Sequence, residues 1–559
     1  MHSTINKKLI LLVFSFFLLV NIASSGGHFD VWDGTETFLV TESMVLKHTA
    51  KLDPTIPSVK KIHFDIFWSE SSNAFRQGSK YYLALYNRDI HDIDKLPAFY
   101  TFRSLLLSTI AVPFYYLAII VSVSPIALVG LFVNSLLISL TSLVIFCFSL
   151  EVYGSKKIAF VLSLIYGVCS FVWPHITSLW PQPLQALILI TSAFFIFKSI
   201  HEHQQIFFIC YYTRQNLNKN KAIYFAGLGG LFLGLSVFAH PTGVLLIPAF
   251  IGYCIFSMIH NRKSLCSFLI VLGVILSFVG LVNYWRFGSV TEFGYGYEGR
   301  LSTHTGWTGL IGLLASPGSG LIFFFPVAIL FPLAMIYMYR KNRGLFFLSA
   351  YIVVVNLLYF GTIPGELFWS GGGWGPRYLI PILPFITIVS GILLQRIKKT
   401  FHFKYGRLFM KLSIIILSAA GFFVNLLGIL VWVFYGVWYG FTNDFQYMRM
   451  GYYWDPFHSH LIIQIKTLVS GYVSHINPEQ WVSMQFWSSL YQGLAPCPYD
   501  NYIFCKFGII PILLLSALIG VVAVLIMMEL SKFNPNVFFV IQLKSIKRGT
   551  YMIIHLLQK

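Results

Sequence analysis

Twelve apolar runs, each about long enough to cross a lipid bilayer, constrain this chain more than any other feature of its sequence. The hydrocarbon core of a bilayer is about 30 Å thick, and a helix needs about 17–25 apolar residues to cross it. Only 11% of the 559 residues are charged, whereas a soluble domain has roughly 25%. The sequence therefore predicts an all-α polytopic membrane protein with about twelve transmembrane helices. The runs lie at residues 9–25, 126–150, 158–173, 183–199, 223–239, 242–259, 265–284, 321–339, 344–360, 378–395, 411–433 and 508–528.

The basic residues are concentrated on one side of these predicted helices. Together with both chain ends, that side carries 24 of the 39 Lys and Arg residues but only 3 of the 20 Asp and Glu residues. The positive-inside rule makes this side cytoplasmic. The net charge of +19 thus indicates membrane topology rather than nucleic-acid binding. We expect a multi-pass protein of the cell membrane with cytoplasmic N- and C-termini.

The apolar stretch 101–124 does not fit this alternation. A thirteenth helix here would place either the N-terminus or the later basic loops outside. We therefore predict that 101–124 lies at the outer interface or re-enters from it, with Pro113 interrupting it. Residues 26–125 then form one large outer loop with juxtamembrane helices, and this loop carries half of the acidic residues.

Two features of the ends of the chain allow alternative interpretations. The basic N-terminus, its apolar run and Ala23-Ser24-Ser25 fit a cleaved signal peptide as well as a first transmembrane helix. Cys497 and Cys505 fall in the predicted outer loop 435–507. An oxidising exterior would allow a disulfide between them, and two free thiols fit equally. No CxxC metal or redox pattern occurs.

Acidic side chains follow the first predicted helix directly, in the segment that includes Asp30, Asp33 and Glu36. A carboxylate at the membrane surface can accept a proton from a hydroxyl group. The alternative is that these residues only face water, as most surface acids do.

Two arginines stand at predicted outer helix ends among glycine and aromatic residues. Arg286 follows Tyr284-Trp285, and Arg377 lies between Trp374 and Tyr378 after a run of glycines. Arginine binds phosphate bidentately, although a lone arginine at a helix end often only extends to the interface. No charged residue lies near the middle of a predicted span, which argues against ion-coupled transport.

Several short motifs occur in an order found in one family. They are Trp32-Asp33-Gly34-Thr35-Glu36-Thr37-Phe38, Arg286-Phe287-Gly288-Ser289 and Gly375-Pro376-Arg377-Tyr378. With these motifs the chain resembles the GT-C superfamily of membrane glycosyltransferases over roughly residues 5–400. The resemblance is to the branch that contains protein O-mannosyltransferases and lipid A aminoarabinose transferases. It implies a transmembrane catalytic module at 1–400, followed at 401–559 by a transmembrane pair, the outer loop 435–507 and a basic cytoplasmic tail.

The resemblance also implies a reaction. A hexosyl or pentosyl group would pass from a polyprenyl-phosphate donor in the bilayer to a hydroxyl of a glycan, lipid or protein on the outer face, with inversion and without a metal or other cofactor. Asp33 would be the base, with Asp30 as second choice, and Arg286 and Arg377 would bind the donor phosphate. The resemblance further implies a set of residues lining the substrate, namely Trp32, Glu36, Gln182, Trp374 and Tyr378.

Gln182 is a departure from this pattern, because many relatives carry an acid there. Two functions other than transfer remain open. The first alternative is a flippase or carrier of lipid-linked saccharides without catalysis, and the second is a scaffold that binds a partner through its outer loops.

Overall fold

The computed structural model describes residues 7–27, 29, 32–53, 55–56, 100–177, 179–213, 220–259, 261–294, 306–362, 373–400, 404–431, 454–470 and 501–531. Every structural statement below concerns these residues. The named elements among them are all α- or 3-10 helices, and Gly373 and Gly375 form an isolated β-bridge. Cys497 lies outside the described residues, so the predicted disulfide is not tested.

Ten helical segments of the described chain are long and apolar enough to cross a membrane. Eight are single helices and two begin with a 3-10 turn. The structure therefore confirms an all-α, multi-pass membrane protein. The segments are α1 (Lys7–Ser24), α6 (Pro125–Tyr153), α8 (Pro181–Thr213), α9 (Asn220–Ala239), η5 (Pro241–Leu246) with α10 (Ile247–Met258), α11 (Arg262–Phe287), α15 (Arg343–Gly361), η7 (Arg377–Ile382) with α16 (Leu383–Thr400), α17 (Lys404–Leu430) and α23 (Ile509–Ser531).

The predicted number of twelve spans is not confirmed, because two of the predicted runs do not form long continuous helices in the structure. The run at 158–173 corresponds to α7 (Lys156–Cys169), which has only 14 residues. The run at 321–339 is divided into α13 (Leu321–Phe324), η6 (Pro326–Leu330) and α14 (Phe331–Lys341). Proline has no amide hydrogen to donate to the preceding turn, and Pro326 and Pro332 stand at the starts of η6 and α14.

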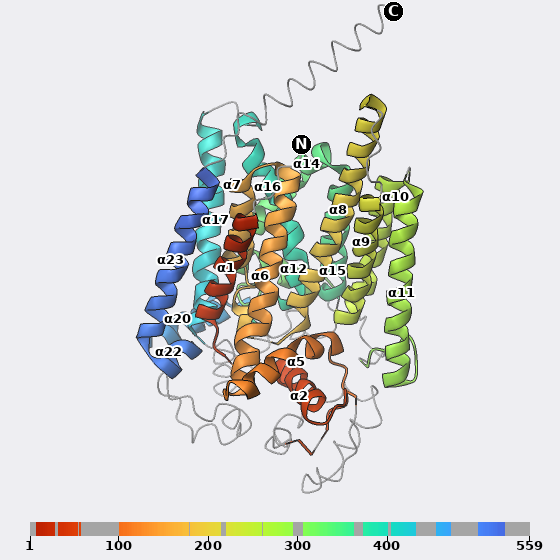
Figure 1. Cartoon of the computed structure of the whole chain (residues 1–559). Helices are drawn as coiled ribbons and strands as arrows, with labels where there is room; N and C mark the ends of the chain where they lie inside the picture. Colours follow the sequence, from red (N-terminus) through yellow and green to blue (C-terminus); the bar gives the residue numbers. More distant parts are fainter. Residues whose placement is uncertain are drawn as a thin grey trace, which may run out of the picture.

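The long helices form one bundle, in which α16 is the most enclosed span and α11 and α23 are the least enclosed. Figure 1 shows α11 and α23 at opposite edges of the bundle. The shorter elements are η4 (Pro174–Thr177), α12 (Gly306–Ala315), η8 (Pro456–His458), α20 (His460–Ser470) and α22 (Tyr502–Phe507).

The first and last helices pack against each other in opposite directions. Lys8 Nζ lies 3.6 Å from Glu529 Oε1 at one end of the pair. At the other end, Asn501 Nδ2 donates a 2.6 Å hydrogen bond to the carbonyl oxygen of Ala23. Both ends of the described chain therefore lie at the same end of the bundle, as the charge pattern predicts. Which compartment that end faces remains a prediction.

Helix α2 (Trp32–Leu46) and helix α5 (Leu105–Ile120) lie together at the opposite end of the bundle (Figure 1). Thr41 Oγ1 donates to the carbonyl oxygen of Ser108 at 3.2 Å, and Phe38 packs on Tyr115 at 5.7 Å between ring centroids. Helix α5 has 16 residues and is not among the ten spans, in keeping with the interfacial position predicted for 101–124. The prediction that Pro113 interrupts this segment is wrong, because α5 continues through it.

Helices α9 and α11 approach closely because glycines face the neighbouring helix. A Cβ atom at Gly230 would overlap the carbonyl oxygen of Phe268, and one at Gly234 would lie 2.6 Å from Ile275. Close approach of helices through small residues is a common source of stability in membrane proteins. In contrast, a Cβ atom at Gly273 on α11 would meet nothing within 4 Å.

We expect Gly230→Ala to destabilise the protein by about 1–3 kcal/mol, because a backbone carbonyl cannot yield as a side chain can. The midpoint temperature of unfolding in detergent should fall by several degrees, as measured by differential scanning fluorimetry. Gly273→Ala is the matched control and should leave the midpoint unchanged or raise it, since alanine favours helix over glycine. Equal effects of the two changes would contradict the packing argument.

Candidate active site

Asp33 stands in the first turn of α2, at the end of the bundle where α2 and α5 meet. Glu36 follows it by three residues and thus lies on the same face of the helix. The side chain of Asp33 is 30% exposed, whereas that of Glu36 is 2% exposed. One carboxylate is therefore accessible and the other is enclosed.

Arg103 connects these two carboxylates. Its Nε donates to Glu36 Oε2 at 2.7 Å, and its Nη2 donates to Asp33 Oδ1 at 2.7 Å. The guanidinium group also lies 4.2 Å from the ring centroid of Phe102. Arg103 directly precedes Ser104, whose hydroxyl caps α5 by accepting from the amide of Leu107. The start of α5 therefore sets the position of Arg103.

Arg377, the first residue of η7, holds the other oxygen of Asp33. Its Nη1 lies 3.1 Å from Asp33 Oδ2. The guanidinium group stacks on the ring of Trp180 at 4.0 Å, and Nη2 donates to the hydroxyl of Tyr378 at 3.4 Å. Gly375, two residues earlier, has a φ of +70°, a conformation that favours glycine. The glycine-rich segment thus makes the turn that brings Arg377 to Asp33.

The charge state of Asp33 follows from these neighbours. Burial by itself would raise the pKa of Asp33, but the charges and hydrogen bonds of Arg103 and Arg377 outweigh it. The pKa of Asp33 is therefore held below its ordinary value, and the carboxylate is ionised at neutral pH. His175 in η4 packs on Trp180, the residue on which Arg377 stacks, with 5.0 Å between the centroids of the two rings. Burial, together with the charge of Arg377, lowers the pKa of His175 to about 3, so this imidazole is neutral.

Arg286, at the end of α11, contacts the site indirectly. Its Nη2 donates to the carbonyl oxygens of Thr101 and Arg103, the latter at 3.0 Å. The structure therefore brings the two predicted phosphate-binding arginines to one region, but Arg103 stands between Arg286 and Asp33. Arg103 was not recognised from sequence. Its only local signal is an isolated basic residue beside the helix-capping Ser104 in an acid-rich predicted outer loop.

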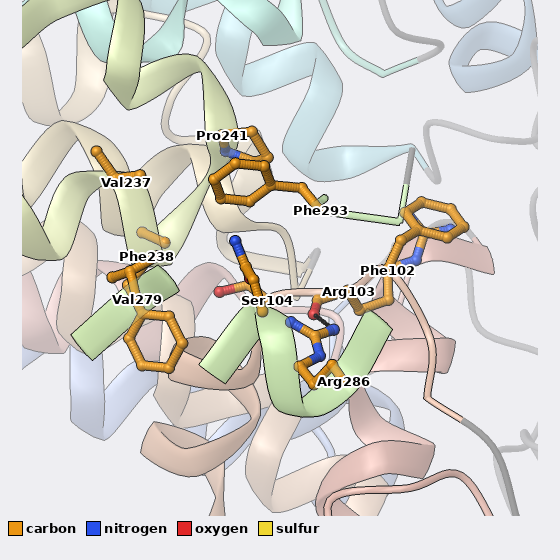
Figure 2. A pocket seen from close by; sticks show the side chains of 11 residues that line it. Phe102, Arg103, Ser104, Val237, Phe238, Pro241, Val279, Arg286 and Phe293 are labelled. Atoms are coloured by element: carbon orange, nitrogen blue, oxygen red, sulfur yellow. Dashed lines mark hydrogen bonds between the residues drawn. The ribbon is translucent and has the colours of Figure 1, made fainter. Parts of the chain in front are cut away.

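A pocket adjoins Arg103 and Arg286, between the start of α5 and helices α9 and α11. Figure 2 shows Phe102, Arg103 and Arg286 on one side and the apolar side chains of α9 on the other. The hollow therefore combines positive charge with an apolar wall. The full lining is Phe102, Arg103, Ser104, Val237, Phe238, Ala239, Pro241, Val279, Asn283, Arg286 and Phe293.

The remaining predicted site residues have different surroundings. Asp30 and the side chain of Trp32 lie outside the described residues. Gln182 is 4% exposed, and its Oε1 has no hydrogen-bond partner within the described part of the chain. Tyr378 stacks on Phe360 at 4.6 Å beside Arg377.

Trp374 and Glu36, like Gln182, present almost no surface to a substrate. Trp374 is 1% exposed, donates to Asn425 Oδ1 at 3.2 Å and packs on Phe324 and His460 in the core. Glu36 is directed to Arg103 rather than to the accessible side of Asp33. In this structure both residues support the site from within the protein.

No three His, Cys, Asp or Glu side chains of the described ranges are grouped so that they could hold a metal ion. The sequence-based expectation of transfer without a metal stays a prediction.

We expect Arg103→Met to destabilise the protein by about 3–5 kcal/mol, because it leaves the enclosed Glu36 without its guanidinium partner. Thermal unfolding in detergent measures the effect, and Arg103→Met combined with Glu36→Gln should recover much of the loss. The control is Lys198→Met, which breaks the more exposed 3.7 Å pair with Glu151 and should cost at most about 1 kcal/mol. Similar losses in the two single variants would refute the structural role of Arg103.

The stabilising effect of Asp33 should depend on pH. Since its pKa is lower in the folded protein than the ordinary value of 3.8, its contribution is present above that value and is lost as the pH falls below it. The difference in unfolding midpoint between wild type and Asp33→Asn should thus be constant from about pH 5 to 7 and shrink below about pH 4. A difference that grows towards acid pH would contradict the assigned charge state.

Comparison with known proteins gives likenesses of structure only. No protein-family model matches the chain, and no curated protein matches its sequence. The fold is similar to ArnT from Cupriavidus metallidurans bound to undecaprenyl phosphate, with a TM-score of 0.44 and 11% identity over 88% of this chain and 75% of that one. The apo state of the same protein gives a TM-score of 0.45 and 12% identity over 86% and 75% of the two chains. The apo oligosaccharyltransferase of Archaeoglobus fulgidus gives a TM-score of 0.38 and 11% identity, over 82% of this chain and 59% of that one.

Proposed function

We propose that this protein is a membrane glycosyltransferase that moves a sugar from a polyprenyl-phosphate-linked donor to an acceptor hydroxyl at the extracytoplasmic face. One observation carries the proposal. The accessible carboxylate of Asp33 lies between the guanidinium groups of Arg103 and Arg377, at 2.7 and 3.1 Å. The proton acceptor is thus within hydrogen-bond distance of two groups that can bind phosphate.

Asp33 supplies the base. Its side chain is 30% exposed, and a carboxylate oxygen that accepts one hydrogen bond retains a second lone pair. An acceptor hydroxyl can therefore approach Asp33 and pass its proton to it as the oxygen attacks the anomeric carbon. This is a single displacement and inverts the configuration of that carbon.

The arginines bind the leaving group. As the bond between the anomeric carbon and the phosphate oxygen breaks, its electron pair adds a negative charge to the lipid phosphate. Positive groups beside that position stabilise the transition state. Arg103 and Arg377 lie next to the base, at 2.7 and 3.1 Å from Asp33, and their planar forks match phosphate oxygens. Arg286 holds the backbone of Arg103 and completes the positive side of the pocket.

The position of the candidate site at the end of the bundle suits a donor that has both a lipid chain and a phosphate. The pocket wall formed by Val237, Phe238 and Val279 comes from the spanning helices α9 and α11. A polyprenyl chain can lie along such an apolar wall while its phosphate meets the arginines at the end of the bundle. By the positive-inside rule, we infer from the basic loops that this end of the bundle lies on the outer face.

The test is transfer of radiolabelled sugar in proteoliposomes, with hexosyl and pentosyl polyprenyl-phosphate donors compared. Asp33→Asn should lower the rate by about 10²- to 10⁴-fold, the usual contribution of a positioned base. Asp53→Asn is the control, because Asp53 lies in the same predicted outer segment and its described hydrogen bonds are with Thr55, away from the arginines of the site.

Full activity of Asp33→Asn would remove Asp33 from the mechanism, and Asp30→Asn would then test the second choice. Movement of the labelled lipid between leaflets without any product would identify a carrier instead of a transferase.

A further inference from the structure

Glu36, Arg103, Asp33 and Arg377 form a row in which negative and positive side chains alternate. The three ion pairs of this row measure 2.7, 2.7 and 3.1 Å. Arg103 is held along two edges, by Glu36 at Nε and by Asp33 at Nη2. The proposed reaction uses three members of the row directly and assigns no role to Glu36.

Glu36 cannot contact a substrate in this structure, because its side chain is only 2% exposed. A carboxylate this deeply buried is costly unless it is paired. Its Oε2 accepts from Arg103 at 2.7 Å, so Glu36 is in direct contact with a guanidinium group that also binds Asp33. The site therefore contains one accessible carboxylate and one enclosed carboxylate that holds the neighbouring arginine.

Sugar transfer moves one negative charge from Asp33 to the lipid phosphate. The phosphodiester of the donor carries one negative charge, and the lipid phosphate monoester that leaves carries two. Asp33 takes the proton of the acceptor hydroxyl and loses its own charge, so the total is unchanged. The guanidinium groups that face Asp33 before transfer must therefore face the phosphate afterwards.

We propose that Glu36 is a positioning residue for this exchange, an inference that rests on the proposed function. Glu36 holds Arg103 by its Nε edge, so that the Nη2 edge can pass from Asp33 to the departing phosphate without the side chain leaving the site. Without the charge of Glu36, Arg103 binds Asp33 more tightly. The base then accepts a proton less readily, and the arginine follows the phosphate less readily.

The other described charged and titratable groups around Asp33 lie on elements other than α2. Arg377 and Tyr378 face it from η7, and Arg286 acts from α11 through the carbonyl oxygen of Arg103. His175 lies beyond Trp180, which stacks on Arg377. A change in the pH dependence of the Glu36 variant therefore reports on the link between Glu36, Arg103 and Asp33.

The experiment compares Glu36→Gln with wild type as the full chain in proteoliposomes, with a polyprenyl-phosphate sugar as donor. We expect kcat to fall by about 10- to 100-fold, as for loss of one charge-assisted hydrogen bond, and the donor KM to change far less. The acid limb of the pH profile of kcat should move to lower pH, because stronger pairing with Arg103 lowers the pKa of Asp33. Glu42→Gln is the matched control, since Glu42 is a buried glutamate of the same helix that accepts from Tyr115 at 3.0 Å. Its acid limb should match that of wild type.

Glu36→Asp provides a second variant that keeps the charge but withdraws it by one methylene group. Its kcat and acid limb should fall between those of wild type and Glu36→Gln, which also covers the case in which the glutamine variant does not fold. Wild-type kcat in Glu36→Asp, or equal losses in the two glutamine variants with unmoved acid limbs, would overturn the positioning role while leaving the proposed transfer intact. Failure of the wild-type protein to bind or use any polyprenyl-phosphate sugar would instead reject the proposed function, and this inference with it.

Discussion

The pairing of Asp33 with two guanidinium groups is the interaction on which the candidate site depends. Charged side chains near the apolar part of a membrane protein are costly unless they meet opposite charges. Here the requirement joins three segments that are far apart in sequence, since Arg103 and Arg377 lie 70 and 344 residues from Asp33. The start of α2, the start of α5 and the turn before α16 therefore meet at one end of the bundle. The long helices form the bundle, and these ion pairs connect three segments at one end of it.

The same arrangement explains how a site for a polar reaction can be built in so apolar a chain. The described ion pairs lie towards the ends of the bundle, as in Lys8 with Glu529 at one end and Asp33 with its arginines at the other. Between these ends, some polar side chains bond to one another within the bundle, as where Asn21 Nδ2 donates to Ser139 Oγ at 2.9 Å. The described ion pairs are thus found towards the ends of the bundle, where the proposed reaction is placed.

The sequence predicts the transmembrane helices better than the candidate site. The helices depend on local composition, whereas the site depends on contacts between residues far apart in the chain. Hydropathy depends on local length and composition, and ten of the twelve predicted runs are long apolar helices in the structure. Proline was the main source of error: Pro326 and Pro332 divide one predicted span, whereas Pro113 fails to interrupt α5. The same residue type has opposite effects because neighbouring packing decides whether the lost hydrogen bond is tolerated.

For the candidate site, Asp33 was singled out as an acid directly after the first predicted helix within a family-like motif, and Arg377 as an arginine among glycine and aromatic residues. Arg103 has no such local context, and only the fold shows that it bridges Asp33 and Glu36. Trp374 is three residues from Arg377 in sequence, yet it is directed into the core towards Asn425. Proximity along the chain therefore grouped Trp374 with Arg377, but it could not say which of the two side chains is directed to Asp33.

The spacing of the ion pairs also has a consequence for the order in which the molecule is assembled during synthesis. Membrane helices emerge from the ribosome in sequence, and N-terminal parts fold first. Asp33, Glu36 and Arg103 are available once the first hundred or so residues have been made, so two of the three ion pairs of the row can form early. Arg377 arrives more than 270 residues after Arg103, and Asn501 reaches Ala23 only across a separation of 478 residues. The candidate site therefore stays incomplete until Arg377 has been made, and before that point Arg103 is the member of the row that can pair with both carboxylates.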